Sequence, residues 1–266
     1  MQKEINIIGN GYMGSQISAL YLLLGYKVNI FYNKSKNLNS LKNNIKLLKK
    51  KYHFEKNDEH YDFFDDLSKI KKFPTIECIN EDLGSKKKVF DIIFKIFDEN
   101  IFSNTSSINI RKINNKINIL HFLNPIFLGI IEVFKTDKIN HSGENIINVL
   151  KNLNFSVINM KSQHDVILNK IIFAEISEFF FLIEKQKINK FELLASLQKI
   201  KNFNLLNLVD VIGLDTCLSI LKNLNEIDQK YYVPEILEKA VEDLILGKKN
   251  KKSINLIFLS QNYPDR

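Results

Sequence analysis

A stretch near the start of the chain decides the fold: Lys3-Glu4-Ile5-Asn6-Ile7-Ile8-Gly9-Asn10-Gly11-Tyr12-Met13-Gly14-Ser15-Gln16. Its β-branched run predicts a strand, and the glycines that follow have the spacing G-x-G-x-x-G ahead of a helical pattern. In such a strand-turn-helix unit the first glycine permits a tight turn and the second lets the backbone approach a diphosphate. The third lets the helix pack closely on the sheet. Amides and the dipole at the helix start favour an anion there.

We therefore expect a dinucleotide cradle formed by Gly9, Gly11, Tyr12, Met13 and Gly14. The alternative is an ordinary turn between a strand and a helix, because glycines also serve plain turns. The position of the motif, on the first strand of an α/β pattern, favours the cradle.

The first half of the chain alternates short β-branched runs with helical patterns, which is typical of βαβ units. We predict strands at residues 5–8, 27–32, 75–79, 101–104, 117–122, 131–134 and 156–160, and helices at 12–24, 41–51, 86–97 and 144–153. This order indicates the α/β class, with a Rossmann-type, doubly wound, mostly parallel sheet.

Beyond about residue 163 the pattern changes to long stretches of periodic apolar residues, which predict helices. We expect them at residues 166–184, 190–200, 205–224 and 233–246. A chain of 266 residues is long enough for two modest domains. We therefore predict a Rossmann domain at 1–163, followed by an all-α C-terminal domain at 164–266.

The formal net charge of +8 comes mainly from lysines scattered along the chain. The runs Lys49-Lys50-Lys51 and Lys86-Lys87-Lys88 lack interleaved aromatic residues, so we interpret them as solvated surface and expect no nucleic-acid partner. A basic field still favours a polyanionic ligand such as a nucleotide or coenzyme A.

The two cysteines, Cys78 and Cys217, lie far apart and lack metal-ligand spacing, so we expect neither a disulfide nor a bound metal. A reduced, cytoplasmic location fits this composition. The first predicted strand begins almost at Met1, and we expect no cleaved leader. Glutamates interrupt the longest apolar run, near residues 171–183, so we expect no membrane span.

The end of the second predicted strand bears on the choice of cofactor. An acidic residue there usually holds the adenosine ribose hydroxyls. This chain instead has Phe31-Tyr32-Asn33-Lys34-Ser35-Lys36, where Asn33 and Lys34 could accept a 2′-phosphate. We therefore expect NADP or NAD, with NADP preferred. The alternative is that lysines occur here only because they occur throughout the chain.

Further motifs follow the glycine turn in a fixed order. They are Ser103-Asn104-Thr105-Ser106-Ser107, Leu120-His121-Phe122-Leu123-Asn124-Pro125, Ile131-Glu132-Val133 and Val166-Ile167-Leu168-Asn169-Lys170. Together with the segments at 76–83 and 211–216, they resemble the 3-hydroxyacyl-CoA dehydrogenase family over most of the chain.

The resemblance implies a two-domain enzyme that oxidises the 3-hydroxyl of an acyl-CoA to a ketone, or runs in reverse. The helical domain would bind substrate and form a homodimer. The residues that match the family's functional positions are His121 as the catalytic histidine, Glu132 as its paired carboxylate, Ser106 and Asn169 as hydrogen-bond donors, and Glu81, Lys86 and Asn104 near the nicotinamide.

The chemistry is coherent with these assignments. Removing a hydride from a secondary alcohol requires that the hydroxyl proton leave too, and a histidine can take it near neutral pH. A carboxylate on the far ring nitrogen would fix the tautomer and stabilise the imidazolium. Ser106 and Asn169 would donate hydrogen bonds to the ketone oxygen in the reductive direction.

Each assignment has a structural alternative. His121 could be a half-buried histidine bonded to backbone, and Asn169 a polar residue on an apolar helix. Ser106 and Asn104 could be N-caps of a helix that begins near Ile108. The remaining histidines have no motif around them and are expected at the surface: His53, His60, His141 and His164.

The sequence also departs from the family pattern. His121 and Glu132 are one position closer than usual, and a register shift between their strands would turn the carboxylate away. Other departures lie in the predicted helical domain, as at Ser253-Ile254-Asn255-Leu256. Two alternatives therefore stay open: the same chemistry on an acyl-carrier-protein thioester, or a catalytically silent cofactor-binding homologue.

Overall fold

A computed structural model describes residues 3–54, 60–161, 166–201 and 204–255. The chain divides into two compact units, Met1–Val166 and Ile167–Arg266. The domain boundary expected at residues 163 and 164 lies outside the described residues. Each unit is described by itself.

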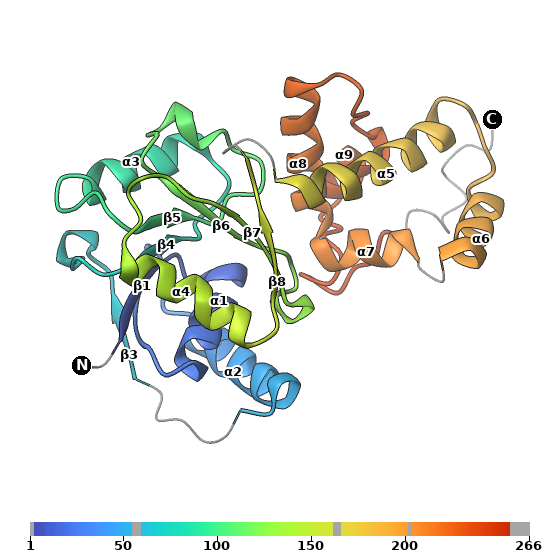
Figure 1. The fold of residues 1–266 in the computed structure, drawn as a ribbon. Helices are drawn as coiled ribbons and strands as arrows, with labels where there is room; N and C mark the ends of the chain where they lie inside the picture. The colour runs from blue at the N-terminus through green and yellow to red at the C-terminus, as the bar shows by residue number, and fades with distance from the viewer. Residues whose placement is uncertain (1–2, 55–59, 162–165, 202–203, 256–266) are drawn as a thin grey trace. The chain divides into compact units, whose positions relative to one another are not determined.

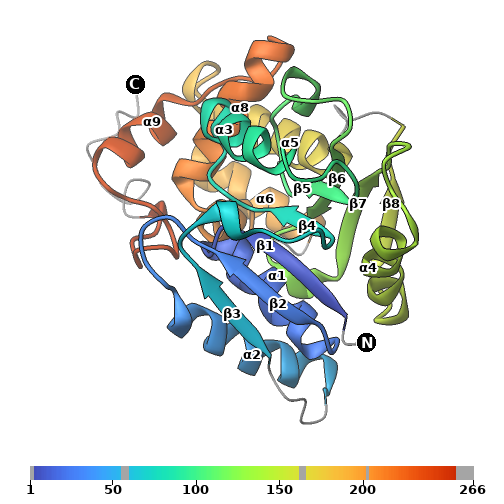
Figure 2. The same cartoon turned by 90° about the vertical axis from the view of Figure 1, so that its left-hand side faces the viewer.

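The first unit contains an eight-stranded sheet with the strand order β3-β2-β1-β4-β5-β6-β7-β8 (Figure 2). All neighbouring strands are parallel except β6 and β7. This confirms the expected mostly parallel sheet. The strands are β1 (Glu4–Ile8), β2 (Lys27–Phe31), β3 (Tyr61–Phe64), β4 (Thr75–Glu77), β5 (Ile101–Ser103), β6 (Asn118–Phe122), β7 (Ile130–Phe134) and β8 (Ser156–Asn159).

Helices cover both faces of this sheet. α1, α2 and α4 lie on one face and α3 on the other (Figure 1). Alternation along β1 explains the arrangement, since Ile5 and Ile7 pack toward α1 whereas Ile8 packs in the cluster that includes α3. The helices are α1 (Tyr12–Leu23), α2 (Leu38–Tyr52), α3 (Leu83–Ile93), α4 (His141–Asn152) and the short 3-10 helices η1 (Leu67–Lys69), η2 (Ile110–Lys112) and η3 (Ile126–Leu128).

The strand order creates a switch point between β1 and β4. From β1 the chain proceeds outward through β2 and β3, then returns to place β4 on the other side of β1, with Ile8 opposite Glu77. In doubly wound sheets, ligands bind at the carboxyl ends of the strands beside such a point. At this edge Glu81 follows β4, and Asn104 and Ser106 follow β5.

The second unit is helical, as expected. Its helices are α5 (Ile167–Glu184), α6 (Lys190–Lys201), α7 (Leu205–Ile212), α8 (Leu214–Ile227) and α9 (Glu235–Glu242). The expectation of one helix over 205–224 is wrong, because Gly213 has a φ of 97° and separates α7 from α8. Glu184 of α5 accepts hydrogen bonds from the first amides of α9, at Glu235 and Ile236.

Three further differences from the sequence expectations concern the first unit. β3 was not predicted, since Tyr61-Asp62-Phe63-Phe64 does not alternate. Lys86, expected in a solvated run, is buried, whereas Lys87 and Lys88 are exposed. Within the described residues no α-helix begins near Ile108; the 3-10 helix η2 follows, capped by Asn109.

The expected surface position of three histidines is confirmed. His53, His60 and His141 are exposed, while His164 lies outside the described residues. Both cysteines are free thiols in the structure. A search of the described helices finds none long and apolar enough to cross a membrane.

Candidate active site

The glycine turn has the geometry that its spacing predicts. Gly9 has a φ of 103°, and a Cβ there would lie 2.7 Å from the carbonyl oxygen of Cys78. A Cβ on Gly14 would lie 1.9 Å from the carbonyl oxygen of Gly9, so the third glycine lets the helix pack against the turn itself. A Cβ on Gly11 would meet no atom within 4 Å, which leaves the space above the turn open.

The start of α1 fits an anionic group. Its N-cap, Gly11, makes no side-chain capping hydrogen bond, and the first turn contains no acidic residue. The orphan amides and the positive end of the helix dipole therefore suit a diphosphate. Tyr12 is exposed at this turn, and Met13 packs against the core behind it. The residues present fit the diphosphate of a dinucleotide.

The end of β2 lies beside this turn. Asn10 Nδ2 donates a hydrogen bond to the carbonyl oxygen of Ser35 at 2.6 Å, which ties the two loops together. Asn33 and Lys34 are exposed, and Lys36 Nζ lies 6.0 Å from the centre of the Phe63 ring. The structure thus places amide and cationic side chains next to the diphosphate cradle.

His121 and Glu132 lie directly opposite each other on the antiparallel strands β6 and β7. His121 Nδ1 is 2.9 Å from Glu132 Oε2, and both residues are buried. The short connection between the strands turns at Gly129, which has a φ of 67°. The one-residue shortening therefore leaves the two side chains in register. A carboxylate at Nδ1 fixes the proton on that nitrogen and leaves Nε2 as the proton acceptor.

The segment that follows β5 connects to this pair. Asn104 Oδ1 accepts a hydrogen bond from the amide of Phe122, the neighbour of His121, at 2.8 Å. Ser106 donates to Glu81 Oε1 from its amide at 2.8 Å and from its hydroxyl at 3.3 Å. The alternative that Asn104 and Ser106 cap a helix is therefore wrong. Thr105 Oγ1 is the side-chain atom that accepts the Ile108 amide.

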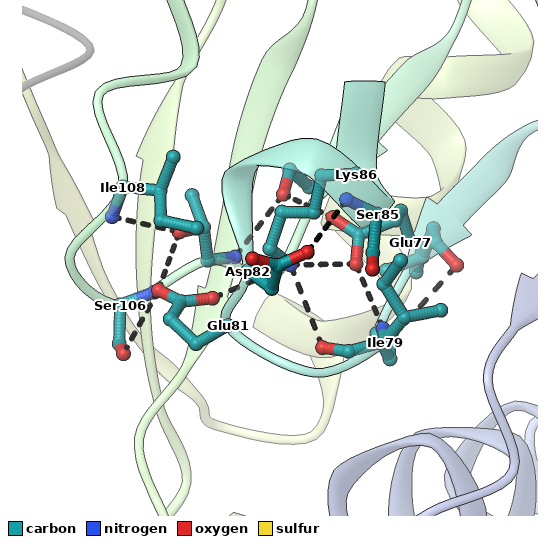
Figure 3. A network of polar contacts seen from close by, with 12 residues as sticks. Glu77, Ile79, Glu81, Asp82, Ser85, Lys86, Ser106 and Ile108 are labelled. Atoms are coloured by element: carbon teal, nitrogen blue, oxygen red, sulfur yellow. Dashed lines mark hydrogen bonds and ion pairs between the residues drawn. The ribbon is translucent and has the colours of Figure 1, made fainter. Parts of the chain in front are cut away.

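Glu81 and Lys86 belong to a buried network (Figure 3). Lys86 Nζ lies 2.6 Å from Glu77 Oε1 and 3.3 Å from Glu81 Oε2. Burial alone would lower the pKa of Lys86, but the two carboxylates outweigh it and raise this pKa. Burial would likewise raise the pKa of Glu81, but Lys86 and donors from residues 105–107 hold it below its ordinary value.

Sequence reasoning assigned no role to two residues of this region. Glu77 ends β4 and is fully buried in the network; an acidic residue at a strand end was the available signal. Asn124, part of the quoted histidine motif, has a buried Oδ1 that accepts no hydrogen bond within the described part of the chain. That atom could accept a hydrogen bond from a ligand.

Asn169 lies on α5 of the second unit, where its side chain is buried. Asn169 therefore belongs to the helical unit, whereas the other predicted site residues belong to the first unit. Across the described residues, no group of three or more His, Cys, Asp or Glu side chains could hold a metal ion.

A doubly wound sheet with a diphosphate cradle at its switch point and an imidazole base at the same edge is typical of dinucleotide-dependent oxidoreductases. The chain belongs to the 3-hydroxyacyl-CoA dehydrogenase family. Residues 4–163 match the family's NAD binding domain, and residues 166–255 match its C-terminal domain. The expected family is thereby confirmed, and the first unit is a nicotinamide-dinucleotide-binding domain.

Individual relatives agree with this family. The chain is 27% identical over 191 residues to a probable 3-hydroxybutyryl-CoA dehydrogenase of Bacillus subtilis, a match that spans 66% of each chain. It is 26% identical to the 3-hydroxybutyryl-CoA dehydrogenase of Bradyrhizobium diazoefficiens, across 94% of each.

Solved structures share the fold. FadB2 of Mycobacterium tuberculosis matches with a TM-score of 0.78 at 23% identity, covering 95% of this chain and 98% of that one. The (S)-3-hydroxybutyryl-CoA dehydrogenase PaaH1 of Ralstonia eutropha matches with a TM-score of 0.75 at 23% identity, covering 96% and 98%.

Proposed function

We propose that the chain interconverts a 3-hydroxyacyl thioester and a 3-ketoacyl thioester, with a nicotinamide cofactor and with His121 as the acid-base group. The 2.9 Å contact between His121 Nδ1 and Glu132 Oε2, at the sheet edge that carries the glycine turn, is the observation on which the proposal rests. The names of the two bacterial relatives support an acyl-CoA substrate.

The nicotinamide ring, when bound, accepts or supplies the hydride. In the oxidative direction His121 Nε2 takes the hydroxyl proton, and Glu132 stabilises the imidazolium that results. In the reductive direction Ser106 and Asn169 donate hydrogen bonds to the ketone oxygen as negative charge develops on it. Asn104, Glu81 and Lys86 flank the nicotinamide end of the cofactor, and Gly9, Gly11, Tyr12, Met13 and Gly14 cradle its diphosphate.

The direct test follows nicotinamide absorbance with acetoacetyl-CoA and each reduced cofactor in turn. Turnover that disappears in His121→Gln, while cofactor binding persists, supports the proposal. Cofactor binding without turnover in the natural chain would instead indicate a catalytically silent homologue. Turnover that occurs only with the same acyl group on an acyl carrier protein would show that this protein, and not coenzyme A, carries the substrate.

NADP is the preferred cofactor in this proposal. The β2 end offers Asn33 and Lys34 where a carboxylate would repel a 2′-phosphate. Lys34→Asp should shift the ratio of NADPH to NADH affinity toward NADH by about tenfold, the effect of roughly one charge-assisted contact. Lys87→Asp on α3 is the matched control. An unaltered ratio in Lys34→Asp would show that the β2 end does not select between the two cofactors.

We also propose that the chain acts in the cytoplasm, as its two free cysteines suggest, and as a homodimer formed through the helical unit, as the family resemblance implies. Light scattering of the purified protein tests the dimer. A monomer at micromolar concentration would contradict it.

A further inference from the structure

Three ionisable side chains meet where β4 runs into α3 (Figure 3). Glu77 ends β4, Glu81 lies in the following turn, and Lys86 lies in the first half of α3. Lys86 Nζ contacts both carboxylates, and the side chains of Lys86 and Glu77 are 1% and 0% exposed. Two carboxylates face one ammonium group, so one negative charge of this cluster is uncompensated.

The hydrogen bonds around Glu77 require its ionised form. Its Oε1 accepts from the amide of Ile79 at 2.7 Å and from Lys86 Nζ at 2.6 Å. Its Oε2 accepts from Ser103 Oγ at 2.6 Å, and Ser103 Oγ itself accepts the Thr105 amide, so its proton points toward Glu77. A proton on Glu77 would compete with donors on both oxygens. The carboxylate is therefore negatively charged.

The cluster lies at the ligand-binding edge of the sheet. Glu77 pairs in register with Ile8, the residue before the glycine turn. Beyond the switch point, the second half of a dinucleotide lies over the next strands of the sheet, which here are β4 and β5. Glu81 Oε1 accepts from Thr105 Oγ1 and from the amides of Ser106 and Ser107, so the cluster also shapes the turn that follows β5.

We propose that Glu77 is a positioning residue that makes this site favour the oxidised form of the nicotinamide cofactor, an inference that rests on the proposed nicotinamide-dependent function. The oxidised ring carries a positive charge that the reduced ring lacks. A buried, uncompensated negative charge therefore stabilises the oxidised form more, and solvent screens a buried charge only weakly. Lys86 Nζ, the amide of Ile79 and Ser103 Oγ fix the Glu77 carboxylate, and Glu77 thereby positions the negative charge of the cluster.

The test is the ratio of two dissociation constants, oxidised over reduced cofactor, measured by calorimetry without substrate. Glu77→Gln removes one negative charge and should raise this ratio roughly threefold to tenfold. Lys86→Met removes the positive charge and should lower it by a similar factor. Either variant decides the question if the other fails to fold. A purely structural role would weaken both affinities alike, and an unchanged ratio overturns the proposal.

Two controls separate charge from geometry. Glu77→Gln/Lys86→Met keeps one uncompensated carboxylate, so its ratio should stay within about twofold of the natural chain even if both affinities fall. Glu144→Gln removes a charge from a pair with Lys135 in which each side chain is 33% exposed, and should leave the ratio unchanged. A double variant that behaves like Glu77→Gln would refute the charge explanation.

The binding measurements distinguish a failure of the proposed function from a failure of the role of Glu77. If the natural chain binds neither cofactor form, the nicotinamide-dependent function itself is wrong. If it binds both, and the ratio is the same in Glu77→Gln and Lys86→Met, only the inference about Glu77 is wrong.

Discussion

Two buried clusters lie at the same edge of the sheet and differ in the nitrogen group that their carboxylates hold. On β6 and β7, Glu132 holds an imidazole, the group to which we assign the proton transfer. Between β4 and α3, Glu77 and Glu81 hold an ammonium group, which stays charged because its pKa is raised. The first group suits a proton that must move, and the second suits a charge that must remain fixed.

The largest effect should come from the group whose proton moves. His121→Gln should reduce kcat about a thousandfold, because no other group would take the hydroxyl proton. Cofactor affinity should stay within about twofold of the natural chain. A kinetic assay that follows nicotinamide absorbance measures kcat, and a fluorescence titration measures the cofactor affinity. His141→Gln, at an exposed position, is the control. Equal losses of turnover and of cofactor binding would show that His121 is not the acid-base group.

Glu132→Gln should reduce kcat about a hundredfold. The amide is neutral, so it stabilises the imidazolium less, and it can favour the wrong tautomer. The double variant with His121→Gln should be no slower than His121→Gln alone, because the two residues act as one unit. Additive losses measured in the same kinetic assay would show that Glu132 acts elsewhere.

The fixed-charge group should instead affect folding. Lys86→Met leaves two carboxylates together without their buried cation, and should lower the free energy of unfolding by about 3–5 kcal/mol. Urea denaturation at neutral pH measures the loss. Lys87→Met, one residue along α3 and exposed, is the matched control. Equal stability of the two variants would mean that Lys86 is solvated in solution.

A smaller effect concerns pH. The pKa of Glu81 is lower in the folded chain than its ordinary value, so Glu81 contributes stability above pH of about 4.3. That contribution is lost as the pH falls through the lowered pKa. The natural chain should therefore lose more stability than Glu81→Gln does between pH of about 5 and pH of about 3, as urea denaturation at each pH can show. Parallel pH profiles would contradict the fixed-charge role of Glu81.

The same contrast explains what the sequence could predict. The parallel sheet and the helical second half follow from periodicity, whereas the pairing of His121 with Glu132 was expected from the resemblance to the family. Lys86 was expected both near the cofactor and in a solvated run. The second expectation is wrong, because Lys86 is buried against carboxylates from outside α3, and the first stays a prediction. A run of charged residues does not show which member is buried when the carboxylates that compensate it come from elsewhere in the chain.

Local backbone geometry accounts for other differences. The expected helix over 205–224 is divided because Gly213 adopts a left-handed conformation that apolar periodicity does not register. The helix expected near Ile108 is absent from the described residues because Thr105 to Ser107 turn around a carboxylate. In the first place a glycine interrupts the helix that the apolar pattern predicts, and in the second place hydrogen bonds to a carboxylate do so.

The antiparallel pairing of β6 and β7 has a consequence for how the proposed acid-base pair is held. His121 and Glu132 are eleven residues apart and belong to adjacent strands of one sheet, joined by a short connection. The ladder that aligns the two strands therefore also sets the distance between the imidazole and the carboxylate. The contact forms wholly within the first unit, so a one-residue slip of this ladder would be enough to abolish it.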